Sequence, residues 1–217
     1  DGLFIERAMV KASDKLAVLS AEAPINAPVM TDGAAFFQLQ EEIRGAFECT
    51  VVDLPRTMLV NYPHLITDVQ VAVLVTELTL AAARDAIRIL SWFKSNAPHT
   101  QMIVVANKVH PSAQLEISRK DFEGSIERRI DHLIPFEPKT AVQAAKLGKP
   151  LAEAGKGVKA LAPLSDIVEK VVAFTDACDD DKKDTKGSKG AKAESGKGGS
   201  LLGKLSGFSM KLPKKKA

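Results

Sequence analysis

The chain has 217 residues, of which 45% are hydrophobic and only 5% aromatic. This length suits one domain with a substantial core, and a core of Ala, Val, Ile and Leu is typical of α/β proteins with buried strands. The net charge of +3 is unevenly distributed. Residues 179–217 contain 11 Lys and 5 Asp or Glu, net +6, whereas the rest contains 19 Lys or Arg and 22 acids, net −3. The acidic balance of the main part argues against a nucleic-acid partner.

Short aliphatic runs predict the strands. They are rich in β-branched residues and show little alternation, as expected for strands covered on both faces. In chain order, the predicted strands are Leu16–Ala21, Thr50–Val52 leading into Asp53, Val69–Thr76, Met102–Ala106 and, more weakly, His132–Pro135.

Helical patterns fall between these runs. The clearest is Leu80–Lys94, in which Ala83, Ile87, Leu90 and Phe93 recur at helical spacing. Thr31 is the expected N-cap of the first helix, and Ser118 with Asp121 resembles a capping box. The predicted helices are Asp32–Phe47, Leu80–Lys94, Ser118–Ile130, Thr140–Lys146 and Pro163–Cys178.

The alternation of strands and helices predicts an α/β fold with a mostly parallel sheet flanked by helices. We expect this fold over residues 1–178. Residues 179–199 are rich in charge, Gly and Ser, which predicts a disordered linker. Residues 200–217 form a basic tail with an amphipathic pattern.

There is no apolar run long enough to span a membrane and no signal-peptide pattern, so a cytoplasmic protein is expected.

Ligands of parallel α/β sheets bind beyond the carboxyl ends of the strands. Asp53 follows the second predicted strand, where a carboxylate could organise magnesium-bound water beside a nucleotide's phosphates. Asn107 follows the fourth, where a carboxamide could pair with the edge of an adenine. Each residue taken alone is equally compatible with a turn or a helix cap.

These signals combine with a third, "IPFEPKTAVQAAKLGKP" at 134–150. Their order and spacing resemble the ParA/MinD group of P-loop ATPases. Within that group, "VVDLPRTMLVNYPHLITDVQVAVLVTELTLAAARDAIRILSWFK" is similar to the CpaE/TadZ branch. The resemblance implies an ATPase that uses ATP and Mg²⁺, forms a homodimer, and helps to assemble a Tad/Flp-type pilus from the cytoplasmic face of the membrane or the cell pole. Pilus assembly components are the implied partners.

The resemblance also assigns roles to individual residues. It makes Asp53 the catalytic, magnesium-side carboxylate, Asn107 the adenine contact, and Pro135 with Phe136 the loop that borders the base. Leu54, Pro55, Arg56 and Thr57 form the switch-like segment. Thr57 stands where the wider group has a glycine that approaches the γ-phosphate, which weakens the expectation of hydrolysis.

The group's phosphate-binding loop, "KGGxGK[ST]", does not occur in the 217 residues. It is expected to precede residue 1. "SGKGGS" at 195–200 follows no strand and lies in a low-complexity stretch, so we do not assign it to phosphate binding. The chain alone is therefore expected to be inactive as an ATPase.

Two further interpretations remain open. The protein could keep the fold as an inactive scaffold, or, less favoured, it could act as a DNA-partition ATPase. The tail favours a weak anchor on an anionic membrane surface, although a frayed tail or a partner-docking peptide would have the same composition. The apolar residues of this proposed anchor are Leu201, Leu202, Leu205, Phe208 and Leu212.

Overall fold

A computed structural model describes residues 5, 7–20, 24, 26, 27, 30–111 and 115–184. The chain separates into two compact units, Asp1–Cys178 and Asp179–Ala217. The elements below belong to the first unit, except that the last helix continues to Asp184. The five apolar tail residues predicted to anchor the chain lie outside the described residues.

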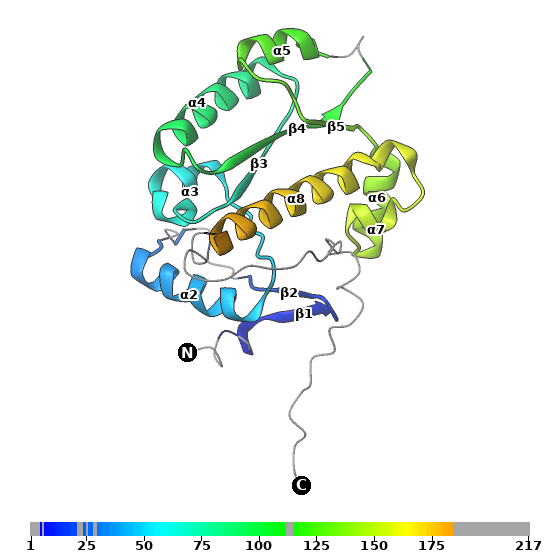
Figure 1. Ribbon diagram of the computed structural model, residues 1–217. Helices are drawn as coiled ribbons and strands as arrows, with labels where there is room; N and C mark the ends of the chain where they lie inside the picture. Colours follow the sequence, from blue (N-terminus) through cyan, green and yellow to red (C-terminus); the bar gives the residue numbers. More distant parts are fainter. Residues whose placement is uncertain are drawn as a thin grey trace, which may run out of the picture. The chain divides into compact units, whose positions relative to one another are not determined.

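A parallel three-stranded sheet forms the centre of the fold (Figure 1). Its strands are β3 (Val71–Thr76), β4 (Gln101–Val109) and β5 (His132–Pro135), in that spatial order. Both pairings are parallel, with Val71 opposite Gln101 and Val105 opposite His132. The aliphatic middle of β4 is fully buried, as its lack of polar alternation predicted. The α/β prediction is confirmed.

Helices cover both faces of this sheet. Side chains alternate between the faces of a strand, so Val104 and Ala106 pack under α4 (Leu80–Asn96) and α5 (Arg119–Ser125). Ile103 and Val105 pack on the other face against Leu161 and residues of α8 (Pro163–Asp184). Figure 1 shows α4 and α5 on one side of the sheet and α8 on the other.

A third hydrophobic cluster includes the segment that precedes β3. Here α3 (Arg56–Asn61) is followed by a short 3-10 turn, Pro63–Ile66. Buried Leu59 and Ile66 pack with Phe93 of α4, and partly buried Leu54 joins them. A helix as short as α3 shows no periodic pattern in the sequence. Buried Leu59 packs the helix against Phe93 of α4. Pro55 lies just before the helix and Pro63 two residues after its end.

The first predicted strand is correct in position only. β2 (Leu16–Val18) pairs antiparallel with β1 (Val10–Ser13) in a separate hairpin, so it is not part of the buried parallel sheet. The helix after it, α2 (Gly33–Ala46), forms as expected. Its N-cap is Asp32 rather than Thr31, because the Asp32 Oδ1 accepts a hydrogen bond of 2.8 Å from the Ala35 N–H.

The predicted strand Thr50–Val52 is wrong. These residues have no regular secondary structure, and the Val51 side chain is 88% exposed. A strand forms only where a neighbour takes its backbone hydrogen bonds, and no described strand pairs with this segment.

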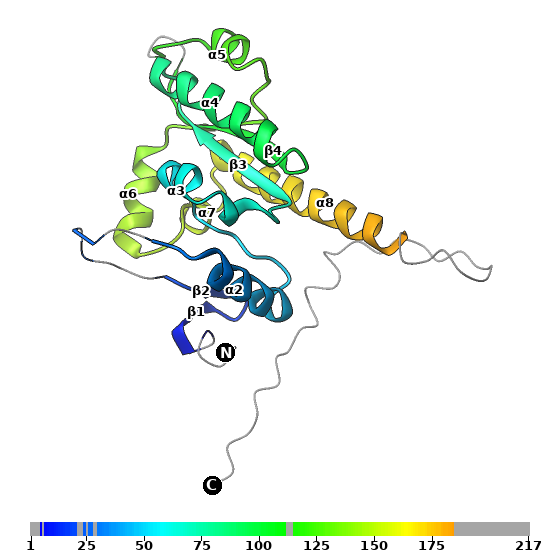
Figure 2. The same cartoon turned by 90° about the vertical axis from the view of Figure 1, so that its left-hand side faces the viewer.

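Strand β3 has one neighbour among the described strands. Its pairing with β4 uses one edge, and no strand of the described residues pairs with the other. In Figure 2, β3 lies in front of β4. The side chains of Val73 and Val75 are 40% and 59% exposed, whereas their partners Ile103 and Val105 are buried by the α8 side of the core.

The remaining helices differ from prediction mainly at their ends. α5 stops at Ser125 instead of Ile130, because Glu127 adopts a left-handed φ of 53° that ends the helix. α6 spans Pro138–Leu147 and ends at Gly148 with φ 61°, the usual left-handed C-cap. A short α7 (Leu151–Ala154) and a 3-10 turn (Lys159–Leu161) were not predicted. Within the described residues, no helix combines the length and apolarity needed to cross a membrane.

Candidate functional site

The carboxyl ends of the three parallel strands meet at one edge of the sheet. Glu77 follows β3, Asn107 and Lys108 lie near the end of β4, and β5 ends at Pro135 with Phe136 directly after it. Val109 lies opposite Pro135 in the register. The structure therefore places Asn107, Pro135 and Phe136 on the same edge, where parallel α/β sheets bind their ligands.

The end of β4 is irregular, and this irregularity positions Asn107. Lys108 has a φ of 51°, and the pairing of β4 with β5 shifts between Ala106 and Val109. The Asn107 Oδ1 accepts a hydrogen bond of 2.9 Å from the Lys108 N–H. Within the described part of the chain, the Asn107 Nδ2 has no partner. The carboxamide is thus oriented by its own backbone and can still donate to a ligand acceptor.

An ion pair joins two strand ends beside Asn107. The Lys108 Nζ lies 2.8 Å from the Glu77 Oε1, and both side chains are about half exposed. Exposed pairs of this kind contribute little to stability. The pair instead keeps the Lys108 ammonium engaged with β3 at the ligand edge.

Two aromatic rings lie next to this edge. The rings of His110 and Phe136 stack with centroids 4.5 Å apart and planes tilted by 35°. The Phe136 N–H donates a 3.0 Å hydrogen bond to the Val109 carbonyl, which fixes the start of the loop after β5. Phe136 remains 43% exposed. An exposed ring supported by a second ring offers a flat apolar surface of the kind that stacks on a nucleobase.

Sequence reasoning singled out Phe136 but missed His110. The only available signal was its position just after β4, because its partner in the stack is 26 residues away.

Asp53 does not join this group. Its expected position at the end of a buried strand is wrong, and it lies exposed in the irregular segment. The next residue, Leu54, packs with Leu59, Ile66 and Phe93. That cluster includes Ala72 and Met102, the second residues of β3 and β4, and so lies toward the amino ends of the strands.

The switch-like segment is tethered to α4. Pro55 precedes the first helical residue of α3, Arg56, and Thr57 is the second. The Arg56 guanidinium forms an ion pair with the Asp85 carboxylate of α4. A movement of this segment would therefore break or shift a contact with α4.

The residues at the strand ends fit a nucleobase better than a triphosphate. A free amide donor and a stacked aromatic pair are present at the edge. A Mg-triphosphate also needs a loop of backbone N–H groups and oxygen ligands. Within the described residues, no three His, Cys, Asp or Glu side chains gather as a metal site. We therefore assign no phosphate or Mg²⁺ chemistry to these residues alone.

The opposite end of β5 carries a structural charge network. The Asp131 Oδ2 accepts a 2.8 Å hydrogen bond from the Val104 N–H, and its Oδ1 forms an ion pair with Lys170 of α8. Burial on its own raises the pKa of Asp131, but the hydrogen bonds from Lys170 and Val104 outweigh it and lower the pKa below its ordinary value. The network ties α8 to the sheet away from the ligand edge.

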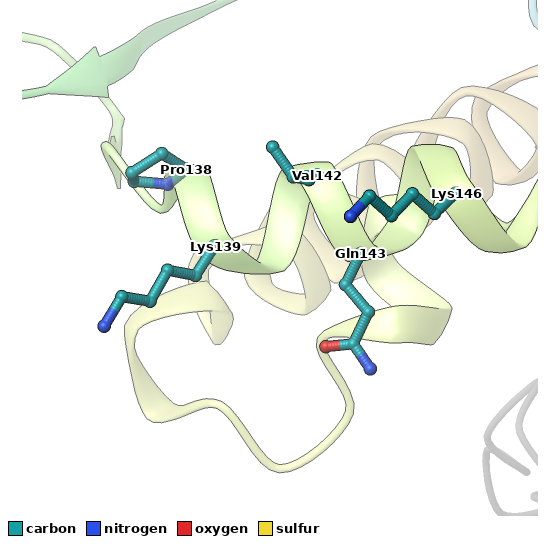
Figure 3. A pocket seen from close by; sticks show the side chains of 5 residues that line it. All are labelled: Pro138, Lys139, Val142, Gln143 and Lys146. Atoms are coloured by element: carbon teal, nitrogen blue, oxygen red, sulfur yellow. The ribbon is translucent and has the colours of Figure 1, made fainter.

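A hollow on α6 carries no comparable chemistry. It is lined only by residues of this one helix: Pro138, Lys139, Val142, Gln143 and Lys146 (Figure 3). Lys139 and Lys146 extend from the helix with no ion pair among the described residues. The hollow is a feature of the helix surface, and no residue of the strand ends lines it.

Comparison with known proteins identifies the fold. No protein-family model and no curated protein sequence matches the chain. Among solved structures, it is similar to a ParA family ATPase from Chlorobium tepidum TLS, with a TM-score of 0.66, 16% identity, and coverage of 76% of this chain and 68% of that one. It is also similar to the MinD cell division protein of Aquifex aeolicus, with a TM-score of 0.61, 22% identity and coverage of 77% and 70%.

The MinC:MinD cell division protein complex of Aquifex aeolicus contains a further match, with a TM-score of 0.63, 21% identity and coverage of 77% and 68%. Structural similarity at such low sequence identity establishes the fold but not the activity. The described α/β unit thus has the fold of the ParA and MinD ATPases.

Proposed function

We propose that this chain supplies the base-binding side of a nucleotide-dependent localisation factor of the ParA/MinD type. The observation that carries the proposal is the edge at which Asn107 and the His110–Phe136 stack follow neighbouring parallel strands of this fold. The proposed nucleotide is ATP with Mg²⁺, and the proposed assembly is a homodimer. Asp53 and residues 54–57 are left out of the proposed site, because Leu54 packs toward the amino ends of the strands, away from this edge.

The cellular role that we propose is assembly of a Tad/Flp-type pilus at the cytoplasmic membrane or cell pole. Its support is the similarity of residues 51–94 to the CpaE/TadZ branch. Two alternatives use the same fold. An inactive scaffold would bind partners without nucleotide, and a DNA-partition ATPase would need a basic folded surface, whereas residues 1–178 carry a net charge of −3.

The first test is nucleotide binding by residues 1–217. We expect adenosine and Mg-ATP to bind equally weakly, with dissociation constants on the order of 1 mM, because the sequence has no phosphate-binding loop to distinguish them. Heteronuclear NMR titration should shift the resonances of Asn107, His110 and Phe136 with either ligand.

Matched substitutions make this test specific. Asn107→Ala should abolish the shifts, whereas Asn61→Ala on α3 and Asp53→Ala should leave them unchanged. Micromolar binding of Mg-ATP by this chain would contradict the assignment of the site. Absence of any adenosine-induced shift would favour the scaffold alternative.

A separate prediction concerns the basic tail. Residues 200–217 should hold the chain reversibly on anionic vesicles, because lysines near an anionic surface contribute about 1 kcal/mol each and the five apolar residues insert at the interface. Co-sedimentation with phosphatidylglycerol vesicles should fall when residues 200–217 are removed, and neutral vesicles should retain neither form. Equal sedimentation of both forms with anionic vesicles would exclude the anchor.

A further inference from the structure

The outward face of α4 combines exposed apolar side chains with two arginines. Ala83, Ala86 and Phe93 face the core and are buried. On the opposite side, exposed residues recur every three or four positions, which places them in one stripe along the helix. These residues are Leu80, Arg84, Ile87, Arg88, Ser91 and Ser95.

A shallow, open groove lies on this stripe. It is formed by α4 alone and is lined by Ile87, Arg88, Ser91, Trp92, Ser95 and Asn96. The Ser95 hydroxyl donates to the Ser91 carbonyl over 3.2 Å, and the Asn96 Nδ2 donates to the Trp92 carbonyl over 2.8 Å. Because the Ser95 hydroxyl and the Asn96 Nδ2 already donate to carbonyls of α4, an apolar side chain in the groove would not leave these two donors unpaired.

The stripe carries uncompensated positive charge. Arg84 and Arg88 are four residues apart, a spacing at which like charges repel and destabilise an isolated helix. In the part of the chain that the structure describes, neither arginine has an acidic partner. The nearby acid on the same helix, Asp85, is occupied by Arg56.

Apolar side chains lie beside these charges. Leu80 and Ile87 are 60% and 42% exposed, and Trp92 lines the groove while its ring packs edge-on against Phe93 at 5.5 Å. An aliphatic residue and a supported aromatic ring next to free guanidinium groups form a surface that combines apolar contact with recognition of carboxylates.

We propose that this face of α4 is a docking surface for an acidic amphipathic helix of a partner protein. The partner's apolar ridge would pack into the groove against Ile87 and Trp92, and its flanking carboxylates would pair with Arg84 and Arg88. A helix fits better than a membrane surface, because the small Ser91 and Ser95 form a groove that accepts a side-chain ridge. The proposal uses none of the residues of the carboxyl-edge site, so it does not depend on nucleotide binding.

The chain contains one tryptophan, Trp92, and it lines the groove. Its fluorescence therefore reports occupancy directly. The probe is a capped 18-residue helical peptide without Trp, with one stripe of Leu flanked by Glu, titrated into residues 1–217. We expect a saturable change in emission with a dissociation constant on the order of 100 µM. The same peptide with Lys in place of Glu should produce no change.

The double variant Arg84→Glu/Arg88→Glu should weaken peptide binding at least about tenfold, because two ion pairs become repulsive. The matched control is Lys139→Glu/Lys146→Glu on α6, which makes the same change in net charge elsewhere and should leave the affinity within about twofold. All four residues are exposed, so both variants should keep the far-ultraviolet circular dichroism of the unmodified chain.

Three outcomes would overturn the proposal. One is the lack of a saturable signal up to 1 mM peptide. Another is an equal loss of affinity in both double variants, which would indicate a general charge effect. The third is tighter binding to phosphatidylglycerol vesicles or duplex DNA that is lost in Arg84→Glu/Arg88→Glu, which would assign the face to another class of partner.

Discussion

Replacing Phe122 by alanine should lower the free energy of unfolding by about 3–5 kcal/mol, the usual cost of removing a large buried ring. Phe122 is fully buried and is the largest such side chain in the described core. It holds the short helix α5 against β4 and α4, within the cluster of Val104, Ala106 and Ala86. Since single domains have a total stability of only about 5–15 kcal/mol, this loss is a large share of the stability of the chain.

Urea denaturation followed by Trp92 fluorescence and circular dichroism measures this loss. Phe37→Ala on α2 removes the same atoms from a side chain that is 55% exposed, and it should change stability by no more than about 0.5 kcal/mol. A loss of stability below about 1.5 kcal/mol for Phe122→Ala would show that Phe122 does not pack in the core between α5, β4 and α4.

Asp131→Ala should have the second largest effect, a loss of about 3 kcal/mol at neutral pH. Removing the carboxylate leaves the buried Val104 N–H without its acceptor and Lys170 without its partner. Asp131→Asn keeps an acceptor for Val104 and removes only the charge, so its loss should be about half as large. Glu153→Gln breaks the exposed pair with Lys149 and serves as a control without a measurable effect.

The pH dependence of this effect has a definite sign. Because the pKa of Asp131 is lowered in the folded state, the unfolded chain binds more protons between the two pKa values, and stability rises with pH across that window. The contribution is complete above the unfolded pKa of about 3.9 and is lost as the pH falls through the folded value. The unfolding free energies of the unmodified chain and Asp131→Asn should differ by a constant amount above about pH 5 and should converge as the pH falls below the unfolded pKa. A difference that stays constant down to the lowest pH at which the chain folds would contradict the network.

The central sheet was predictable from sequence because its strands have a composition that few other structures tolerate. The run Ile103–Ala106 contains no polar residue and is buried on both faces. The composition of this run alone was therefore enough to predict a buried strand. Thr50–Val52 is also rich in β-branched residues but has no described neighbour to pair with. Pairing is a property of the whole fold, and this is why the same reasoning failed there.

The candidate site was predictable only where one residue could be recognised by itself. Asn107 and Phe136 follow strands, and the resemblance assigned them roles. The His110–Phe136 stack, the Lys108–Glu77 pair and the Arg56–Asp85 tether join residues 26, 31 and 29 positions apart. No local pattern encodes such contacts, because they arise when parallel strands and their helices come together.

The edge of β3 has a consequence for how this chain behaves at high concentration. Among the described strands, β3 leaves one set of backbone N–H and C=O groups unpaired, next to the exposed side chains of Val73 and Val75. Such an edge is a template for intermolecular β-association. It has no proline, bulge or outward lysine of the kind that natural proteins use to block aggregation at such edges. Self-association of the isolated chain should therefore begin at β3, and Val75→Lys is the substitution that places a protective charge there.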